Sequence, residues 1–478
     1  MSDYNGAGHN AMDAILQAQK NAQLRDGAPT VEQRRDRLDR AIGVLVKHRG
    51  AINDAVAGDF GHRSKDTTDM ADTAVSIAAL KHARDHLKGW MRSERRKVDF
   101  PLNLLGGAAR VEFQPKGVVG LIAPWNFPVG MVFTPLAGIL AAGNRVMIKP
   151  SEFTERTSAL MQEIIAETFA PEEMTVVTGG PEVGAAFTAL AFDHIIFTGA
   201  GSVAKHIMRA AAENLTPLTL ELGGKSPAIL GESADIAKAA SRIMAGKTMN
   251  AGQICLAPDY VLSPDDKVGA FVDASRSAVG AMFPSGLKDN DDYTSIVNQR
   301  HYDRLQGYLE DAKAKGGELV ELNPQSEDFT QQPYRKMAPT IVLNTSEDMD
   351  VMKDEIFGPI LPVKSYQSID EAIAYVNKND RPLGLYYFGA DRAEEDKVVS
   401  STTSGGVTVN DVIFHNAQED LPFGGIGPSG MGAYHGHDGF LEFSHKKAIY
   451  RQTGNEIIKL FRPPYGETFR KQMDSRIK

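Results

Sequence analysis

The residue with the clearest chemical potential is Cys255, the only cysteine among 478 residues. A lone cysteine is most often a small buried apolar residue, so its surroundings must decide whether it reacts. The thiol follows the segment 250–254, Asn-Ala-Gly-Gln-Ile, whose glycine suits a tight backbone approach better than a packed core. Glu221 lies upstream and Glu355 downstream, each close to a glycine. A thiol with two such glutamates predicts a nucleophile that carboxylates assist.

The composition is that of a globular protein long enough for about two or three domains. Hydrophobic residues make up 42% and charged residues 24%, with a net charge of −9. No clustered basic face stands out, which argues against a nucleic-acid partner. One cysteine excludes an intrachain disulfide framework and suits a reducing compartment. The N-terminus lacks a signal pattern and no apolar run is long enough to span a bilayer, so we expect a cytoplasmic protein without membrane association.

The elements that must position these residues begin with helices. Thr30 precedes Gln33 at the spacing of a capping box, which predicts a helix start. Helical periodicity then continues to about Leu87. The apolar positions expected to face inward on the first helix are Leu38, Ile42, Leu45 and Val46.

From Gly117 apolar runs alternate with helical segments, which predicts a parallel sheet with helices on both faces. Ligands bind beyond the carboxyl ends of such strands, where this chain places Asn, Lys-Pro-Ser-Glu, Gly-Gly and Thr-Gly. A second α/β unit should extend to about Gly424. The four runs of the first unit are 118–123, 146–148, 175–177 and 195–197. Shorter strands are expected at 102–104, 111–113 and 443–451.

Seven motifs in a fixed order resemble the aldehyde dehydrogenase superfamily over nearly the whole chain. They are 124–128 (PWNFP), 149–152 (KPSE), 197–199 (FTG), 221–225 (ELGGK), 250–255 (NAGQIC), 355–359 (EIFGP) and 421–425 (LPFGG). Any one arises by chance, whereas all seven in order are specific. The segments 429–436 and 443–445 resemble the class 3 branch. The segments 257–260 and 59–64 resemble the bacterial coniferyl aldehyde dehydrogenases within it.

The resemblance implies an α/β fold with a Rossmann-like NAD-binding domain, an α/β catalytic domain and a small β oligomerisation segment. The cofactor-binding domain would comprise residues 1–98 and 116–222, and the catalytic domain residues 223–424. The remaining segments would be oligomerisation strands at 99–115 and 441–455, a closing segment at 425–440 and a tail at 456–478. A homodimer is implied, in which the strand 443–451 extends a partner's sheet; the alternative is pairing within its own chain only.

For catalysis, the resemblance implies that the Cys255 thiolate attacks an aldehyde carbon. The thiohemiacetal oxyanion then expels hydride readily onto a nicotinamide, and water hydrolyses the resulting thioester. A free thiol has a pKa of ~8.5 and therefore needs activation. Glu221 resembles the general base, with a salt-bridged surface glutamate as the alternative. Asn126 resembles the oxyanion donor, acting with the backbone N–H of Cys255; the alternative is an Asn that caps the turn before Pro128.

NAD is the expected cofactor, with NADP possible. Lys149 and Glu152 would face the adenosine ribose, where a carboxylate disfavours a 2′-phosphate. Glu355 would hold the nicotinamide ribose, with Phe357 packed nearby; an ordinary acidic loop residue is its alternative. The other residues expected to bind the cofactor are Trp125, Thr198, Gly199, Ser202, Leu222 and Gly223. Trp125 and Phe423 are alternatively core aromatics.

Two features depart from a simple match. Ala204 stands where the family's glycine-rich turn has its final glycine, and its methyl should tighten the contact between helix and cofactor. His435 and His437 are separated by one residue without cysteines or a carboxylate cluster nearby, which is poor evidence for zinc. We therefore expect no metal site and a structural, hydrogen-bonding role for these histidines.

The sequence thus predicts NAD(P)-dependent oxidation of an aldehyde to its acid. The substrate is expected to be aromatic and similar to coniferyl aldehyde, with medium-chain aliphatic aldehydes as the alternative. An acylating dehydrogenase is disfavoured by Glu221, because acylating members generally lack a base there. A non-catalytic protein that keeps the fold is disfavoured because thiol, base and oxyanion donor are all present.

Overall fold

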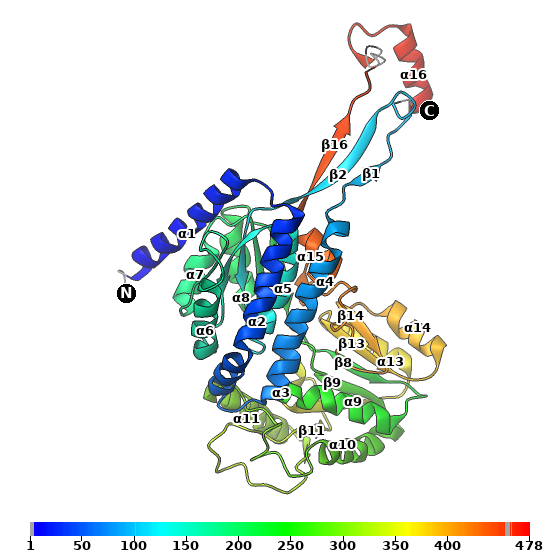
Figure 1. The fold of residues 1–478 in the computed structure, drawn as a ribbon. Coiled ribbons are helices and arrows are strands. Elements are labelled where there is room, and N and C mark those ends of the chain that lie inside the picture. The colour runs from blue at the N-terminus through cyan, green and yellow to red at the C-terminus, as the bar shows by residue number, and fades with distance from the viewer. Residues whose placement is uncertain (1–3, 101, 455–458, 460) are drawn as a thin grey trace.

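The computed structural model describes residues 4–100, 102–454, 459 and 461–478, whose strands form three sheets. The strand orders are β15-β7-β6-β3-β4-β5, β10-β11-β12-β9-β8-β13-β14 and β1-β2-β16. Figure 1 shows the two larger sheets with their helices as the body of the molecule. The three-stranded sheet projects from this body as an arm, with α16 near its tip.

The six-stranded sheet confirms the predicted parallel arrangement. Its strands are β3 (Val118–Ile122), β4 (Arg145–Lys149), β5 (Met174–Val176), β6 (His194–Gly199), β7 (Leu218–Leu222) and β15 (Gly430–Met431). β3 to β7 are parallel, and β15 pairs antiparallel with β7. Each of the four predicted apolar runs coincides with one of these strands, although 118–123 and 175–177 extend one residue past β3 and β5. A strand covered on both faces has no solvent side and therefore has a continuous apolar sequence.

Helices precede this sheet and connect its strands. They are α1 (Tyr4–Asp26), α2 (Val31–Phe60), α3 (Lys65–Thr68), the π-helical turn η1 (Asp69–Ala74), α4 (Val75–Trp90), α5 (Gly130–Ala142), α6 (Glu155–Ala166), α7 (Pro181–Thr188) and α8 (Gly201–Ala212). The capping box of α2 is confirmed, with reciprocal hydrogen bonds between Thr30 and Gln33. Leu38 and Leu45 are fully buried, but Val46 is 61% exposed. The prediction was wrong for Val46 because one further residue turns it about 100° away from Leu45.

The seven-stranded sheet forms the second half of the body. Its strands are β8 (Pro227–Leu230), β9 (Tyr260–Pro264), β10 (Glu318–Glu321), β11 (Thr340–Leu343), β12 (Ile360–Tyr366), β13 (Gly384–Phe388) and β14 (Gly406–Val409). All pair in parallel except β10, which runs antiparallel to β11. Its helices are α9 (Ile236–Thr248), η2 (Met249–Gly252), η3 (Asp265–Lys267), α10 (Val268–Met282), α11 (Gln299–Ala314), α12 (Asp350–Lys353), α13 (Ile369–Lys378) and α14 (Arg392–Ser401).

The arm consists of β1 (Glu94–Arg96), β2 (Ala108–Pro115) and β16 (Ser444–Arg451), flanked by α15 (Gly436–Glu442) and α16 (Glu467–Ile477). The predicted last strand is confirmed as β16, which pairs with β2 along its whole length. The predicted strand at 102–104 is wrong. Gly107 and Leu105 both donate to the Leu102 carbonyl, so these residues form tight turns, and β2 pairs instead with β1 and β16. Among the described residues, no helix has the length and apolarity needed to cross a membrane.

The segment that carries Cys255 lies between two apolar cores. Ala251 belongs to the core of the seven-stranded sheet, together with residues of α9 and α10. Ile254 and Leu256, on either side of the thiol, belong to the core formed by α2, α4, α5 and the six-stranded sheet. The sequence between α9 and β9 is thereby anchored on both sides, which places the thiol at the junction of the two sheets.

Candidate active site

The thiol loop, residues 249–255, has an unusual backbone. Asn250, Ala251 and Gly252 all have positive φ, at 50°, 52° and 72°. A non-glycine residue there costs roughly 1–2 kcal/mol, so packing around the loop must impose this conformation. A Cβ on Gly252 would lie 2.3 Å from the carbonyl oxygen of Gly358. Glycine thus lets the thiol loop lie directly against the segment that carries Glu355.

Gln253 fixes the shape of the thiol loop from inside. Its Nε2 donates to the carbonyl oxygens of Asn250 at 2.9 Å and Ser295 at 3.0 Å. Its Oε1 accepts from the backbone N–H of Val297 at 3.0 Å. A fully buried amide with both ends bonded holds the backbone before the thiol in one conformation.

Cys255 is partly buried. Desolvation raises the pKa of its thiol, and the charges of Glu221 and Glu355 raise that pKa further. The backbone N–H groups of Cys255 and Leu256 donate to the sulfur and act in the opposite direction. The thiol is therefore neutral near pH 7 in this state and needs a base to remove its proton.

Asn126 contacts the thiol loop directly. Its Nδ2 donates to the Gln253 carbonyl at 3.1 Å, so one amide N–H faces the loop and a second remains to be donated. The backbone carbonyl of Asn126 accepts from Asn250 Nδ2 at 3.1 Å and from Arg63 Nη1 at 2.7 Å. The side chain reaches across to Gln253, 127 positions along the chain, rather than capping the turn before Pro128.

Glu221 lies inside the sheet on β7, where it is paired with Thr198 of β6 and Gly430 of β15. It is 2% exposed, which excludes the alternative of a surface glutamate. The N–H of Gly425 donates to its carboxyl group, yet burial still raises its pKa well above the usual value. Its Oε1 is buried without a hydrogen-bond partner among the described residues, which leaves an acceptor for water or a thiol proton.

Glu355 packs against the backbone that follows Glu221. A Cβ on Gly223 would lie 2.1 Å from Glu355 Oε2, so any larger residue there would displace the carboxylate from this position. Burial and the charge of Asp259 raise the pKa of Glu355 to about 8, against a backbone hydrogen bond from Gly224. Within the described part of the chain its enclosed Oε1 has no partner, which distinguishes it from an ordinary loop residue.

Lys225 and Asp259 hold the Glu355 segment, residues 354–359, in place. The sequence analysis did not identify either residue individually. The two form a partly buried ion pair. Asp259 Oδ1 accepts from the N–H of Ile356 at 2.9 Å, and Lys225 Nζ donates to the Asp354 carbonyl at 2.8 Å. Lys225 ends the motif ELGGK and Asp259 lies in the segment 257–260, so their place within these motifs could have identified them.

Aromatic rings line the space beside these carboxylates. Trp125 contacts Phe357 edge to face at 5.3 Å, and Phe357 has a positive φ of 49°. Trp125 also lies 5.1 Å from His301 of α11, a residue that the sequence did not predict. Burial lowers the pKa of His301 to about 4, so this ring is neutral. Phe423, by contrast, is 4% exposed and is a core aromatic.

Lys149 and Glu152 lie together at the carboxyl end of β4, as predicted from the motif. Lys149 Nζ donates to the Pro150 carbonyl at 2.9 Å and lies 3.8 Å from Glu152 Oε2. Burial lowers the pKa of Lys149, whereas the charges of Glu152 and of Glu182 raise it. Glu182, in the first turn of α7, is a second carboxylate at this position that the sequence did not predict.

The other predicted cofactor residues follow neighbouring strands. Thr198 and Gly199 end β6, where they pair with Glu221 and Leu222 of β7. Ser202 is exposed in the first turn of α8. The carboxyl ends of β4, β6 and β7 therefore present Lys149, Thr198 and Glu221 at one edge of the sheet.

Ala204 is 1% exposed and packs in an apolar cluster with Ile207 and Leu220. Its methyl is thus accommodated within the protein, and the tighter contact with a cofactor stays a prediction.

The enclosed Oε1 of Glu355 and the Lys149–Glu152 pair fit the ribose hydroxyls of a dinucleotide.

His435 and His437 make different contacts. His435 stacks on Phe423 at 4.9 Å, and His437 lies 5.7 Å from Trp90. Nδ1 of His435 is buried without a partner among the residues described, so its role is ring packing and the expected hydrogen-bonding role is wrong for this ring nitrogen. No group of three or more metal-ligating side chains occurs in the described part of the chain.

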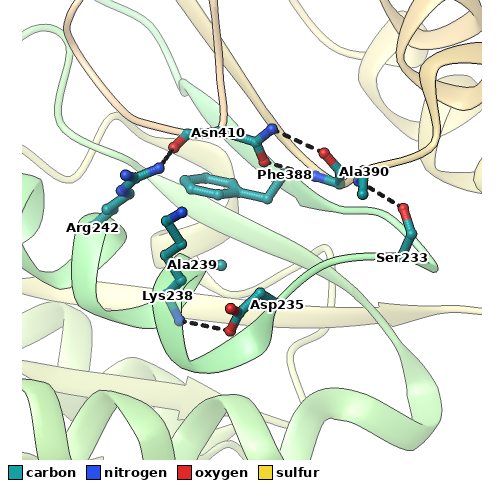
Figure 2. A pocket seen from close by; sticks show the side chains of 9 residues that line it. Ser233, Asp235, Lys238, Ala239, Arg242, Phe388, Ala390 and Asn410 are labelled. Atoms are coloured by element: carbon teal, nitrogen blue, oxygen red, sulfur yellow. Dashed lines mark hydrogen bonds between the residues drawn. The ribbon is translucent and has the colours of Figure 1, made fainter.

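A separate cavity of about 200 Å³ lies at the carboxyl ends of β8, β13 and β14 (Figure 2). Lys238, Arg242, Phe388 and Asn410 are among its lining residues. Figure 2 shows Arg242 donating to the Asn410 carbonyl, so part of its polar surface is already paired. None of the predicted site residues lines this cavity.

Comparison with known proteins identifies the family. The family model described as "Aldehyde dehydrogenase family" matches residues 1–449. The chain belongs to the aldehyde dehydrogenase family. It is 60% identical to the "Probable coniferyl aldehyde dehydrogenase" of Caulobacter vibrioides, over 98% of this chain and 97% of that protein. It is 54% identical to the "Coniferyl aldehyde dehydrogenase" of a Pseudomonas species, over 97% and 96%.

Among solved structures, the fold resembles "Substrate bound state of Staphylococcus Aureus AldH" with a TM-score of 0.91 and 34% identity. The match covers 98% of this chain and 99% of that one. This aldehyde dehydrogenase therefore has the fold class that the sequence predicted.

Proposed function

We propose that this aldehyde dehydrogenase oxidises aromatic aldehydes of the coniferyl type, with NAD as the preferred cofactor. The relatives named for coniferyl aldehyde, at 60% and 54% identity over nearly the whole chain, support the substrate. The observation that carries the mechanism is the contact between Asn126 and the thiol loop, at 3.1 Å from Nδ2 to the Gln253 carbonyl. This contact supports a role for the Asn126 amide beside a thiol that the charges of Glu221 and Glu355 influence.

The first step is attack of the Cys255 sulfur on the aldehyde carbon. Glu221 has a buried oxygen without a partner among the described residues, and burial raises its pKa, which makes the ionised carboxylate a stronger base toward the thiol proton. Negative charge then develops on the substrate oxygen. The second N–H of Asn126 and the N–H of Cys255 stabilise that charge, and removal of one such donor typically lowers the rate by ~10²–10³.

A bound nicotinamide supplies the acceptor for the substrate's hydride. Glu355 would hold its ribose through the enclosed Oε1, and Trp125 and Phe357 would confine it against the thiol loop. Water then hydrolyses the thioester on Cys255. After Glu221 has passed the thiol proton to solvent, it takes a proton from that water, whose oxygen attacks the thioester carbon; cleavage of the carbon–sulfur bond then releases the acid and the Cys255 sulfur. Glu221 suits this step because it is a buried carboxyl group near the thiol with a free oxygen.

The preference for NAD rests on charge. Glu152 lies 3.8 Å from Lys149, and Glu182 also acts on the Lys149 ammonium. Two carboxylates beside the ribose would repel the 2′-phosphate of NADP.

The proposal also includes a cytoplasmic homodimer. A free thiol needs a reducing compartment, and β16 has an open edge with which a second copy can pair.

A steady-state screen of coniferyl aldehyde against hexanal, each with NAD and NADP, tests the proposal. We expect the highest kcat/KM with coniferyl aldehyde and NAD, and no turnover by Cys255→Ala, which should still bind NADH. A higher kcat/KM for hexanal would replace the aromatic substrate with an aliphatic one. A coenzyme A thioester formed in place of free acid would indicate an acylating enzyme, and no NADH from any aldehyde would indicate a non-catalytic protein.

A further inference from the structure

The oxyanion turn, residues 124–128, is held at its C-terminal end by Asp72. Asp72 Oδ1 accepts from the backbone N–H of Val129 at 3.0 Å and of Gly130 at 2.7 Å. These are the first N–H groups of α5, which have no partner within the helix and carry the positive end of its dipole. Asp72 lies in the π-helical turn η1, an irregularity that often occurs at functional sites.

The same turn is held at its centre by Arg63. Arg63 Nη1 donates to the Asn126 carbonyl at 2.7 Å, and its Nη2 donates to Asp72 Oδ2 at 2.7 Å. The guanidinium also lies over the ring of Phe127 at 4.9 Å and that of Phe60 at 5.1 Å. One planar cation thus contacts Asp72 and two successive residues of the oxyanion turn.

Burial makes this arrangement rigid. The side chains of Arg63 and Asp72 both have 0% exposure, so water does not screen their attraction. A buried pair is stabilised when its remaining hydrogen-bonding groups are satisfied, and here the Asn126 carbonyl accepts from Arg63 while the N–H groups of Val129 and Gly130 donate to Asp72. Arg63 Nε has no partner among the described residues. The conformation of the turn is therefore coupled to the ion pair.

The functional consequence lies in the position of the Asn126 side chain. Arg63 holds the backbone carbonyl of Asn126, and the side-chain amide of Asn126 donates to the Gln253 carbonyl of the thiol loop. A shift of the turn would move the oxyanion donor relative to the Cys255 sulfur. We propose that Arg63 and Asp72 are positioning residues that hold the Asn126 amide at the oxyanion. This assignment rests on the proposed role of Asn126.

Arg63→Lys is the main test variant. Lysine keeps the positive charge beside Asp72, but it lacks the planar fork that reaches the ion pair and the Asn126 carbonyl together. The pre-steady-state burst of NADH should slow by on the order of 10–10²-fold, as expected for a small misplacement of a donor. Asp72→Asn should act in the same direction, since Asn can still accept from Val129 and Gly130 but cannot pair with the guanidinium.

Two readouts separate positioning from general damage. Alkylation of Cys255 by iodoacetamide develops no oxyanion, so its rate should stay unchanged in Arg63→Lys, as should the dissociation constant for NADH. Arg37→Lys is the matched control, because Arg37 is also a buried arginine bonded to a carboxylate, Glu173, at 3.1 Å. Its burst should equal that of the wild type.

A double variant provides the decisive comparison. If Arg63 acts through Asn126, the Arg63→Lys/Asn126→Ala enzyme should be no slower than Asn126→Ala alone. Multiplied losses, a wild-type burst in Arg63→Lys, or equal slowing of alkylation would each overturn the inference. A wild-type burst in Asn126→Ala alone would instead remove the proposed oxyanion donor and the inference with it.

Discussion

At the scale of single residues, Glu221 and Glu355 are close in space but have different surroundings. Glu221 accepts from the N–H of Gly425 and adjoins the sheet interior, whereas Glu355 packs on Gly223 beside the Lys225–Asp259 pair. Burial raises the pKa of both carboxyl groups. Two acids near one thiol can therefore take different roles, with Glu221 moving protons and Glu355 holding the cofactor.

Glu221→Gln should separate the two halves of the reaction. The amide keeps the shape of the side chain but cannot take a proton from water, so deacylation should slow by about 10²–10⁴-fold. Because Glu221 also takes the thiol proton in the proposed first step, rapid mixing with aldehyde and NAD should show a slowed NADH burst followed by a stall, with the acyl group retained on Cys255 by mass spectrometry. Full steady-state turnover by this variant would exclude Glu221 from the mechanism.

Cofactor affinity should depend on pH through Glu355. Its pKa is raised to about 8 in the free enzyme, and a ribose hydroxyl is best accepted by the ionised carboxylate. Binding then releases a proton, so NADH affinity should rise with pH by up to about tenfold per unit and level off above pH 8. Fluorescence titrations from pH 6 to 9 measure this. Glu355→Gln should be pH-independent over that range; an equal slope in both proteins would assign the linkage to another group.

At the scale of elements, the site depends on three backbone segments that touch. The thiol loop lies against the Glu355 segment at Gly252, and the oxyanion turn lies against the thiol loop at Gln253. The positive φ of Asn250 and Ala251 shows that the thiol loop is shaped by these contacts and by Gln253 rather than by local preference.

Gly252→Ala should disturb both neighbouring segments. The added methyl would meet the Gly358 carbonyl oxygen at 2.3 Å at a φ of 72°, so we expect a loss of about 1–3 kcal/mol in unfolding free energy. NADH affinity should fall as well, since the Glu355 segment must move. Gly280→Ala in α10 is the control, with nothing within 4 Å of the new methyl. It should leave binding unchanged and stabilise the fold by about 0.5–1 kcal/mol in urea unfolding. Wild-type binding by Gly252→Ala would contradict this coupling.

At the scale of the whole molecule, the arm is the feature that bears on the proposed homodimer. β16 pairs with β2 on one side and is the edge strand of its sheet, which projects away from the body (Figure 1). An open strand edge presents unpaired N–H and carbonyl groups, which a second copy can cover. β16 pairs within its own chain and keeps an open edge, so extension of a partner's sheet stays a prediction, and pairing within the chain only remains its alternative.

A homodimer should appear as a species of twice the 51.9 kDa chain mass. Sedimentation velocity over a series of concentrations measures it, and the mass should be insensitive to salt if backbone pairing and apolar contacts dominate. A species of single-chain mass at every concentration would contradict the proposed homodimer.

Much of the fold was accessible from the chain itself. The capping box at Thr30, the four apolar runs of the parallel sheet and the last strand were predicted because each depends on local periodicity or capping chemistry. Val46 and the segment 102–104 were mispredicted because apolar character alone does not reveal which neighbour is available. The motifs likewise identified Cys255, Glu221, Asn126 and Glu355 as candidates.

Only the tertiary structure decided how these candidates meet. Local sequence patterns do not show which residues far apart in the chain come into contact. They therefore did not reveal the contacts of Arg63 and Asp72 with the oxyanion turn, or those of Lys225 and Asp259 with the Glu355 segment. These partners bind backbone carbonyls and N–H groups, which nearly every residue type possesses, so the sequence does not show which of these groups each side chain contacts. The types of the reacting groups are a property of the chain, whereas their alignment is a property of its packing.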